Sequence, residues 1–137
     1  MSDLLFGNSK FEEVEKNRIY VSQDKENGYV LSTSKMYPQG NKEKYWFGYR
    51  LSRLDKIKNV QNKNIVFVCR NDKTLIIEFP KYFIDSILDR LNTSEDEYGS
   101  ITHYHIVIFK DNNKHTMLLS KPTLEEIDIS EYVITEI

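Results

Sequence analysis

Cysteine and glycine are scarce in this chain of 137 residues, which has one cysteine, Cys69, and five scattered glycines. A single cysteine cannot form an intramolecular disulfide, so the sequence gives no sign of an oxidising compartment. None of the glycine-rich patterns that hold phosphate groups is present, and neither is the Gly-x-Ser-x-Gly turn of α/β-hydrolases. The sequence therefore lacks the commonest signatures of nucleotide-dependent enzymes and of serine hydrolases.

Long apolar runs and a strong net charge are also absent. No stretch approaches the roughly 18–20 consecutive apolar residues that a membrane-spanning helix needs, and the first ten residues lack the basic and apolar regions of a secretory signal. The net charge is −2, so the chain as a whole has no general attraction to nucleic acid or to an anionic membrane. We expect a soluble, cytoplasmic protein that has no membrane partner.

The most apolar part of the sequence lies between residues 64 and 109. Residues 65–69 are apolar on both faces of a strand, which is typical of an interior strand, and residues 74–79 are expected to return antiparallel to it. Pro80 then occupies a suitable first position for a helix, because its missing N–H is not needed there. That helix is expected over residues 81–91, and its apolar stripe consists of Ile84, Ile87, Leu88 and Leu91.

Residues 1–44 are expected to be a peripheral N-terminal segment. Ser9 and Glu12 fit a capping box, which predicts a short surface helix to about Lys16. Residues 34–44 contain a proline and a glycine among polar residues and are expected to be a loop.

Residues 45–137 are expected to form the core of a single α+β domain that spans residues 1–137. Residues 45–51 are rich in aromatic side chains and predict a strand, as do residues 101–109. The architecture that follows is one mostly antiparallel sheet of about five strands, with one principal helix (about residues 81–91) packed on it.

Two histidines, His103 and His105, lie on the same side of one expected strand, at a spacing that can chelate a metal ion. His115 is the obvious third ligand. The hairpin that joins the two strands, however, places His115 opposite residue 109 or 110, about 15 Å along the strand from His105. The alternative is that these histidines pack or form hydrogen bonds on a sheet face, and we expect neither a metal nor another cofactor.

Two further residue arrangements in the sequence are candidates for a catalytic site. Cys69 would be a nucleophile only if it were activated, whereas a cysteine in an apolar interior strand is usually a small buried hydrophobic residue. Glu78 and Lys81 differ from the acid and lysine of restriction-type nucleases, which lie two residues apart on one strand; here the spacing is three and Pro80 has ended the strand. We therefore expect no enzymatic activity in this chain.

The strongest lead is a basic segment, in which residues 42–63 contain seven bases and two acids, interleaved with aromatic residues. Basic side chains for phosphates beside flat rings for bases are typical of surfaces that bind single strands or bases. Trp46 and Arg50 share a strand face that Gly48 leaves open, so a shallow platform is expected there. The candidate nucleic-acid-binding residues are Lys44, Trp46, Arg50, Arg53 and Lys56.

A solvated basic face is the alternative interpretation of this segment, since residues 45–51 also have the pattern of an ordinary amphipathic strand. Residues 124–137 carry five acids and no base, and they could neutralise the basic segment within the same chain.

Four short sequences together resemble an accessory, non-catalytic domain of bacterial restriction and phage-defence proteins. They are YWFGY (45–49), a helix opened by Phe-Pro that ends in LNT (91–93), HYHI (103–106) and IDISEY (127–132). The resemblance covers roughly residues 45–134. It implies a small module that associates with DNA or with a partner, while any cutting activity belongs to another domain or chain.

Three functions remain open from the sequence. The first is a non-enzymatic binding module associated with DNA or RNA. The second is a protein-interaction or assembly module, in which a sheet edge or the acidic tail pairs with a partner or a second copy. The third is a metal-dependent enzyme that uses His103 and His105.

Overall fold

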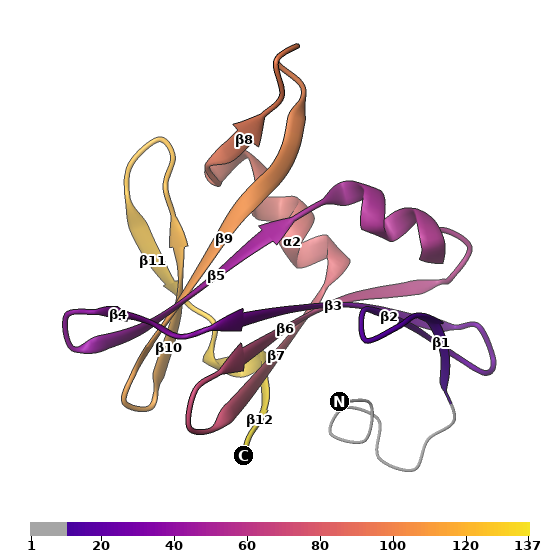
Figure 1. Cartoon of the computed structure of the whole chain (residues 1–137), viewed down its shortest axis with the longest axis horizontal. Coiled ribbons are helices and arrows are strands. Elements are labelled where there is room, and N and C mark those ends of the chain that lie inside the picture. The colour runs from indigo at the N-terminus through magenta and orange to yellow at the C-terminus, as the bar shows by residue number, and fades with distance from the viewer. Residues whose placement is uncertain (1–10) are drawn as a thin grey trace.

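The structure, a computed structural model, describes residues 11–137 as two sheets packed face to face (Figure 1). Sheet A consists, in spatial order, of β1 (Phe11–Glu15), β2 (Ile19–Ser22), β3 (Asn27–Lys35), β6 (Asn62–Arg70), β7 (Thr74–Pro80) and β12 (Val133–Glu136). Sheet B consists of β11 (Glu125–Asp128), β10 (Lys114–Leu119), β9 (Ile101–Asp111), β5 (Lys42–Tyr49) and β4 (Tyr37–Gln39), and β8 (Thr93–Glu95) also pairs with β9. The short helices are η1 (Leu51–Ile57), α2 (Lys81–Ile87), η2 (Leu88–Arg90) and η3 (Ser130–Tyr132).

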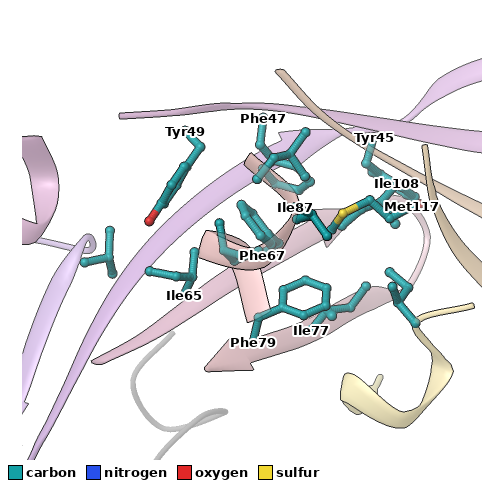
Figure 2. Packing of buried hydrophobic residues seen from close by; sticks show 14 of the residues in the cluster. Tyr45, Phe47, Tyr49, Ile65, Phe67, Ile77, Phe79, Ile87, Ile108 and Met117 are labelled. Atoms are coloured by element: carbon teal, nitrogen blue, oxygen red, sulfur yellow. The ribbon is translucent and has the colours of Figure 1, made fainter. Parts of the chain in front are cut away.

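The main core lies between the two sheets and is rich in aromatic rings (Figure 2). Phe67 of β6 is fully buried, and its ring centroid lies 4.6 Å from that of Phe47 on β5 and 5.8 Å from that of Phe79 on β7. Tyr45, Phe47 and Tyr49 alternate along β5 and all point into this core, as the period-2 pattern of a strand requires. The aromatic residues of β5 therefore hold sheet B on sheet A.

The prediction of an interior strand over residues 65–69 is confirmed. β6 pairs with β3 on one side and with β7 on the other. Ile65, Phe67 and Cys69 belong to the main core, whereas Val66 and Val68 are buried in a second cluster on the other face of sheet A. A strand that is buried on both faces needs apolar residues at every position, which is why its sequence does not alternate.

The α+β class is confirmed, but the prediction of a single sheet of about five strands is wrong. There are twelve strands in two sheets among residues 11–137, and β3 pairs with β6 in parallel while the other strand pairs are antiparallel. The strands that were missed are short and lie at sheet edges, such as β4 (three residues, all exposed) and β11 (four residues, mostly exposed). Exposed edge strands bury few side chains, so they leave little apolar pattern in the sequence.

The principal helix is shorter than the expected span of residues 81–91. Regular α-helix ends at Ile87, whose φ of −116° and ψ of 0° interrupt the helical hydrogen bonds, and η2 follows as a tighter turn. Helices often end in such a 3₁₀ turn, which satisfies some of the last carbonyl groups. The apolar stripe is nevertheless buried, since Ile84, Ile87 and Leu91 all belong to the main core.

Three expectations for the N-terminal third are corrected. Ile19 and Val30 are buried in the main core, so β2 and β3 are not peripheral. The prediction of a short helix to about Lys16 is wrong, because Phe11–Glu15 is a strand. Ser9 of the expected capping box lies outside the described residues. The expected loop over residues 34–44 contains β4 and the start of β5, with Gly40 at φ +60° in the turn between them. None of the helices formed by residues 11–137 is long and apolar enough to span a membrane.

Candidate functional site: a basic cleft beside β3

A cleft of about 870 Å³ opens where the pairing of β3 changes along its length. β3 pairs with β2 only as far as Val30, whereas its pairing with β6 continues to Lys35. One edge of residues 32–35 therefore has no strand partner within the described chain, and the cleft lies along this edge. Its other walls include residues 15–18, residues 46–48 of β5, Arg50 and Arg53. Figure 1 shows that η1, the short helix that carries Arg53, follows β5.

The cleft brings together three of the five candidate residues. Trp46, Arg50 and Arg53 line it. Lys44 lies on the same strand face as Trp46 but opposite Tyr37 of β4, and Lys56 is exposed on η1; neither lines the cleft. We name this site the basic cleft, because its lining includes the five bases Lys16, Arg18, Lys35, Arg50 and Arg53 and one acid, Glu15.

The part of the cleft that comes from residues 15–37 is not among the candidate residues predicted from the sequence. Lys16 and Arg18 precede β2, Lys35 ends β3, and Tyr37 begins β4. These residues are spread over a segment that was expected to be peripheral, and no local pattern links them to residues 46–53. The pairing of β2 with β3 places Lys16 and Arg18 beside β3, and the contact of β3 with β5 brings them to residues 46–53.

Positive charge in the basic cleft is only partly compensated. The Nη1 atom of half-buried Arg53 donates a hydrogen bond to the Ser32 hydroxyl at 3.0 Å. Burial lowers the pKa of the Arg53 guanidinium, and the charges of Arg18 and Arg50 lower it further, while Glu15 opposes them. Glu15 is itself 3.6 Å from Arg18. Since arginine stays protonated in proteins, an anion in the cleft would relieve this repulsion.

The acidic tail neutralises bases elsewhere. Among residues 11–137, its ion pairs join Glu126 to Lys42 (3.2 Å), Glu125 to Arg90 (2.7 Å) and Glu136 to Lys110. Of these bases only Lys42 belongs to the basic segment, and none lines the cleft. The tail therefore leaves Arg50 and Arg53 available to a ligand.

Trp46 is held in a fixed orientation by two histidines. Its indole Nε1–H donates to Nδ1 of His105 at 3.0 Å, and Nε2 of His105 lies 2.8 Å from the Ser94 hydroxyl. The Trp46 ring contacts His103 and His105 edge to face, with centroid distances of 6.0 and 5.4 Å. The ring is still 38% exposed, so it presents a preset aromatic surface to the cleft.

Gly48 does not leave an open platform, contrary to the sequence-based expectation. A Cβ atom at this position would lie 3.2 Å from the His103 ring and 3.3 Å from the Trp46 ring. Both rings therefore lean over the glycine and fill the space above it. The glycine lets two aromatic side chains approach the backbone closely, and a larger residue would require these rings to shift by a few tenths of an ångström.

The histidines do not converge on a metal site. Within residues 11–137 no group of three or more His, Cys, Asp or Glu side chains is arranged to hold a metal ion. His115 pairs with Lys110, as the hairpin predicts. His115 lies two residues before the core residue Met117 on β10, so both side chains are on the face of sheet B that points between the sheets. His103 and His105 lie on the opposite face of sheet B, beside Trp46.

The other catalytic arrangements are also absent from the described residues. Cys69 is fully buried, and burial strongly raises the pKa of its thiol, which keeps it protonated and unreactive. Lys81 pairs with Asp85 at 2.5 Å rather than with Glu78. Burial raises the pKa of Glu78, and no base is paired with its carboxyl group in this part of the chain.

The environment of His115 predicts that the stability of the fold depends on pH. Neither of its buried ring nitrogens has a hydrogen-bond partner within the described chain, and burial lowers its pKa, as does Lys110, while Glu136, Asp128 and Glu43 oppose this. A histidine with a lowered folded-state pKa stabilises the fold fully above its unfolded pKa of about 6.5. That contribution is lost as the pH falls below about 6.5 towards the lowered value.

We therefore expect His115→Leu to flatten the loss of stability between pH 7.5 and 5.5, measured by urea unfolding at each pH. His103 also has a lowered pKa and adds to the loss, whereas the raised pKa of Glu78 makes the fold more stable as the pH falls. Both are present in parent and variant, so the difference between the two proteins isolates His115. Parallel pH profiles for the two proteins would contradict the prediction.

No protein-family model matches the sequence, and neither a curated protein nor a solved structure matches it.

Proposed function

We propose that this protein is a non-enzymatic module that binds nucleic acid in the basic cleft. The observation that carries the proposal is the convergence of Trp46, Arg50 and Arg53 on one concave surface with Arg18 and Lys35. Three separate parts of the chain supply these residues, so the cleft is more than one solvated basic strand. Its groups are suited to binding a polyanion that also carries flat rings.

Arginine is well suited to the phosphate part of this ligand. Its planar guanidinium donates two parallel hydrogen bonds to a phosphate and remains charged. Arg50 has no carboxylate within ion-pair distance among residues 11–137, so phosphate binding there does not require an existing ion pair to break. The resemblance of residues 45–134 to accessory domains of bacterial restriction and phage-defence proteins supports a role beside a cutting activity in another domain or chain.

Fluorescence anisotropy with labelled oligonucleotides, single-stranded and double-stranded, tests the proposal. We expect binding at 50 mM salt that weakens about 20- to 40-fold at 200 mM, because the slope of log K against log salt is about −0.7 to −0.9 for each contacted phosphate and we assume about three contacts. An absence of binding to every oligonucleotide at low salt would overturn the proposal. Binding without salt dependence would show that the cleft does not act through phosphate contacts.

A further inference from the structure

The lining of the basic cleft is divided into an arginine end and an aromatic end. Arg53 bonds through its side chain to Ser32 and through its backbone N–H to the Arg50 carbonyl, and Leu31, next to Ser32, bonds to the Arg18 carbonyl. These contacts place the three arginines together at one end of the cleft. Trp46 lies four residues before Arg50 in extended chain, which separates the two residues by about 13 Å. Tyr37 of β4 is paired with Lys44 of β5, so Tyr37 and Trp46 are diagonal neighbours on these two strands. Diagonal neighbours in a sheet are about 7–8 Å apart, so Trp46 and Tyr37 form a second end.

Both rings at the aromatic end are exposed, and the Trp46 ring is held in place by a hydrogen bond. Tyr37 is 42% exposed, and the Nζ atom of Lys35 lies 5.2 Å from its ring centroid as a cation–π contact. Trp46 is 38% exposed and anchored through its indole N–H to His105. Fixed rings lose little conformational entropy when a flat ligand stacks on them.

The anchoring of Trp46 also determines what the ring can recognise. Tryptophan has a single donor, the indole N–H, and His105 already accepts it. No polar atom of Trp46 remains to read the edge of a base, so its contribution is stacking and van der Waals contact. Stacking tolerates every base, since each has a π face.

From these observations, and resting on the proposed function, we infer that the ligand is single-stranded nucleic acid that places an unpaired base against Trp46 and its phosphates on Arg18, Arg50 and Arg53. A base within a duplex has both faces covered by its neighbours and cannot stack on a side chain, whereas bases of a single strand can turn outward. A duplex would reach the arginine end only. DNA and RNA share this chemistry, and the binding is expected to depend little on sequence.

The test compares three labelled oligonucleotides: a single strand, the same strand with abasic sites, which has the same phosphates, and its duplex, to which the second strand adds further phosphates. Trp46 is the only tryptophan in the chain, so its intrinsic fluorescence reports from the cleft itself. We expect the single strand to quench this fluorescence and to bind about tenfold more tightly than the abasic strand, the effect of losing one stacked base. Deoxyribose and ribose versions distinguish DNA from RNA.

Substitution of Trp46 gives the matched variants. Trp46→Ala is expected to bind the normal and abasic strands equally well, through the arginines, whereas Trp46→Phe keeps a ring and most of the discrimination. The ratio of the two affinities is the readout, so a general loss of stability does not imitate the result. Equal affinity of the parent protein for normal and abasic strands, or for strand and duplex, would overturn the inference and leave the proposed function standing. Failure of all three oligonucleotides to bind would instead overturn the proposed function.

Discussion

Replacement of both Arg50 and Arg53 by alanine is expected to weaken nucleic-acid binding at least about 100-fold at 50 mM salt. Each charge-assisted hydrogen bond contributes about 1.5–3 kcal/mol, and about 1.4 kcal/mol corresponds to a tenfold change in affinity. The slope of log K against log salt is expected to become shallower by about 1.4–1.8, since two phosphate contacts are lost. Anisotropy titrations of parent and variant at several salt concentrations measure both quantities.

The matched control is the double substitution Lys56→Ala/Lys58→Ala. It also removes two positive charges, both of them at exposed positions of the same basic segment but outside the cleft lining. A general attraction of the chain to a polyanion would weaken equally in both double variants, and that outcome would contradict the assignment of the cleft. Because Arg53 also bonds to Ser32, urea unfolding of both variants checks that the fold is intact.

Replacement of Ile84 by aspartate is expected to unfold the domain. Ile84 is fully buried in the main core, on the helix that directly follows β7 and packs on both β6 and β7. A carboxylate at this position would be buried without a partner, at a cost of several kcal/mol. Total stabilities of domains are only about 5–15 kcal/mol. Near-ultraviolet circular dichroism and urea unfolding should show the loss of fixed aromatic packing.

Tyr82→Asp is the control for this substitution. Tyr82 lies two residues earlier on α2 and is 75% exposed, so the same charge remains in water there. We expect this variant to change the free energy of unfolding by less than about 1 kcal/mol, as is usual for surface positions. Equal stabilities of the Ile84→Asp and Tyr82→Asp variants would show that the apolar stripe of α2 does not hold the fold together.

The scaffold was largely predictable because its signals are local. The apolar run of β6, the return of β7, the buried stripe that begins at Ile84 and the pairing of His115 with Lys110 all followed from patterns within about ten residues. Alternation, helical periodicity and short turns have direct geometric consequences. Short edge strands such as β4 were missed for the opposite reason, since they bury almost nothing.

The candidate site was only partly predictable. The composition of residues 42–63 pointed to Trp46, Arg50 and Arg53, which do share one cleft, but it also included Lys44 and Lys56, which do not line it. Composition identifies a charged segment, but it does not show in which direction each side chain points. The bond from Trp46 to His105 joins residues 59 positions apart, and no local pattern indicates such a contact.

The sequence by itself determined the alternation that turns Tyr45, Phe47 and Tyr49 inward and Trp46 outward on β5, because successive side chains of a strand point to opposite faces. Tertiary structure alone decided that β3 would pair in parallel with β6, lose its β2 partner after Val30 and leave an open edge facing Trp46. Long-range strand pairing depends on which arrangement satisfies the backbone hydrogen bonds and buries the apolar surface of the whole chain. The basic cleft is a product of that global choice, since the β2–β3 hairpin has no local reason to meet Arg50 and Arg53.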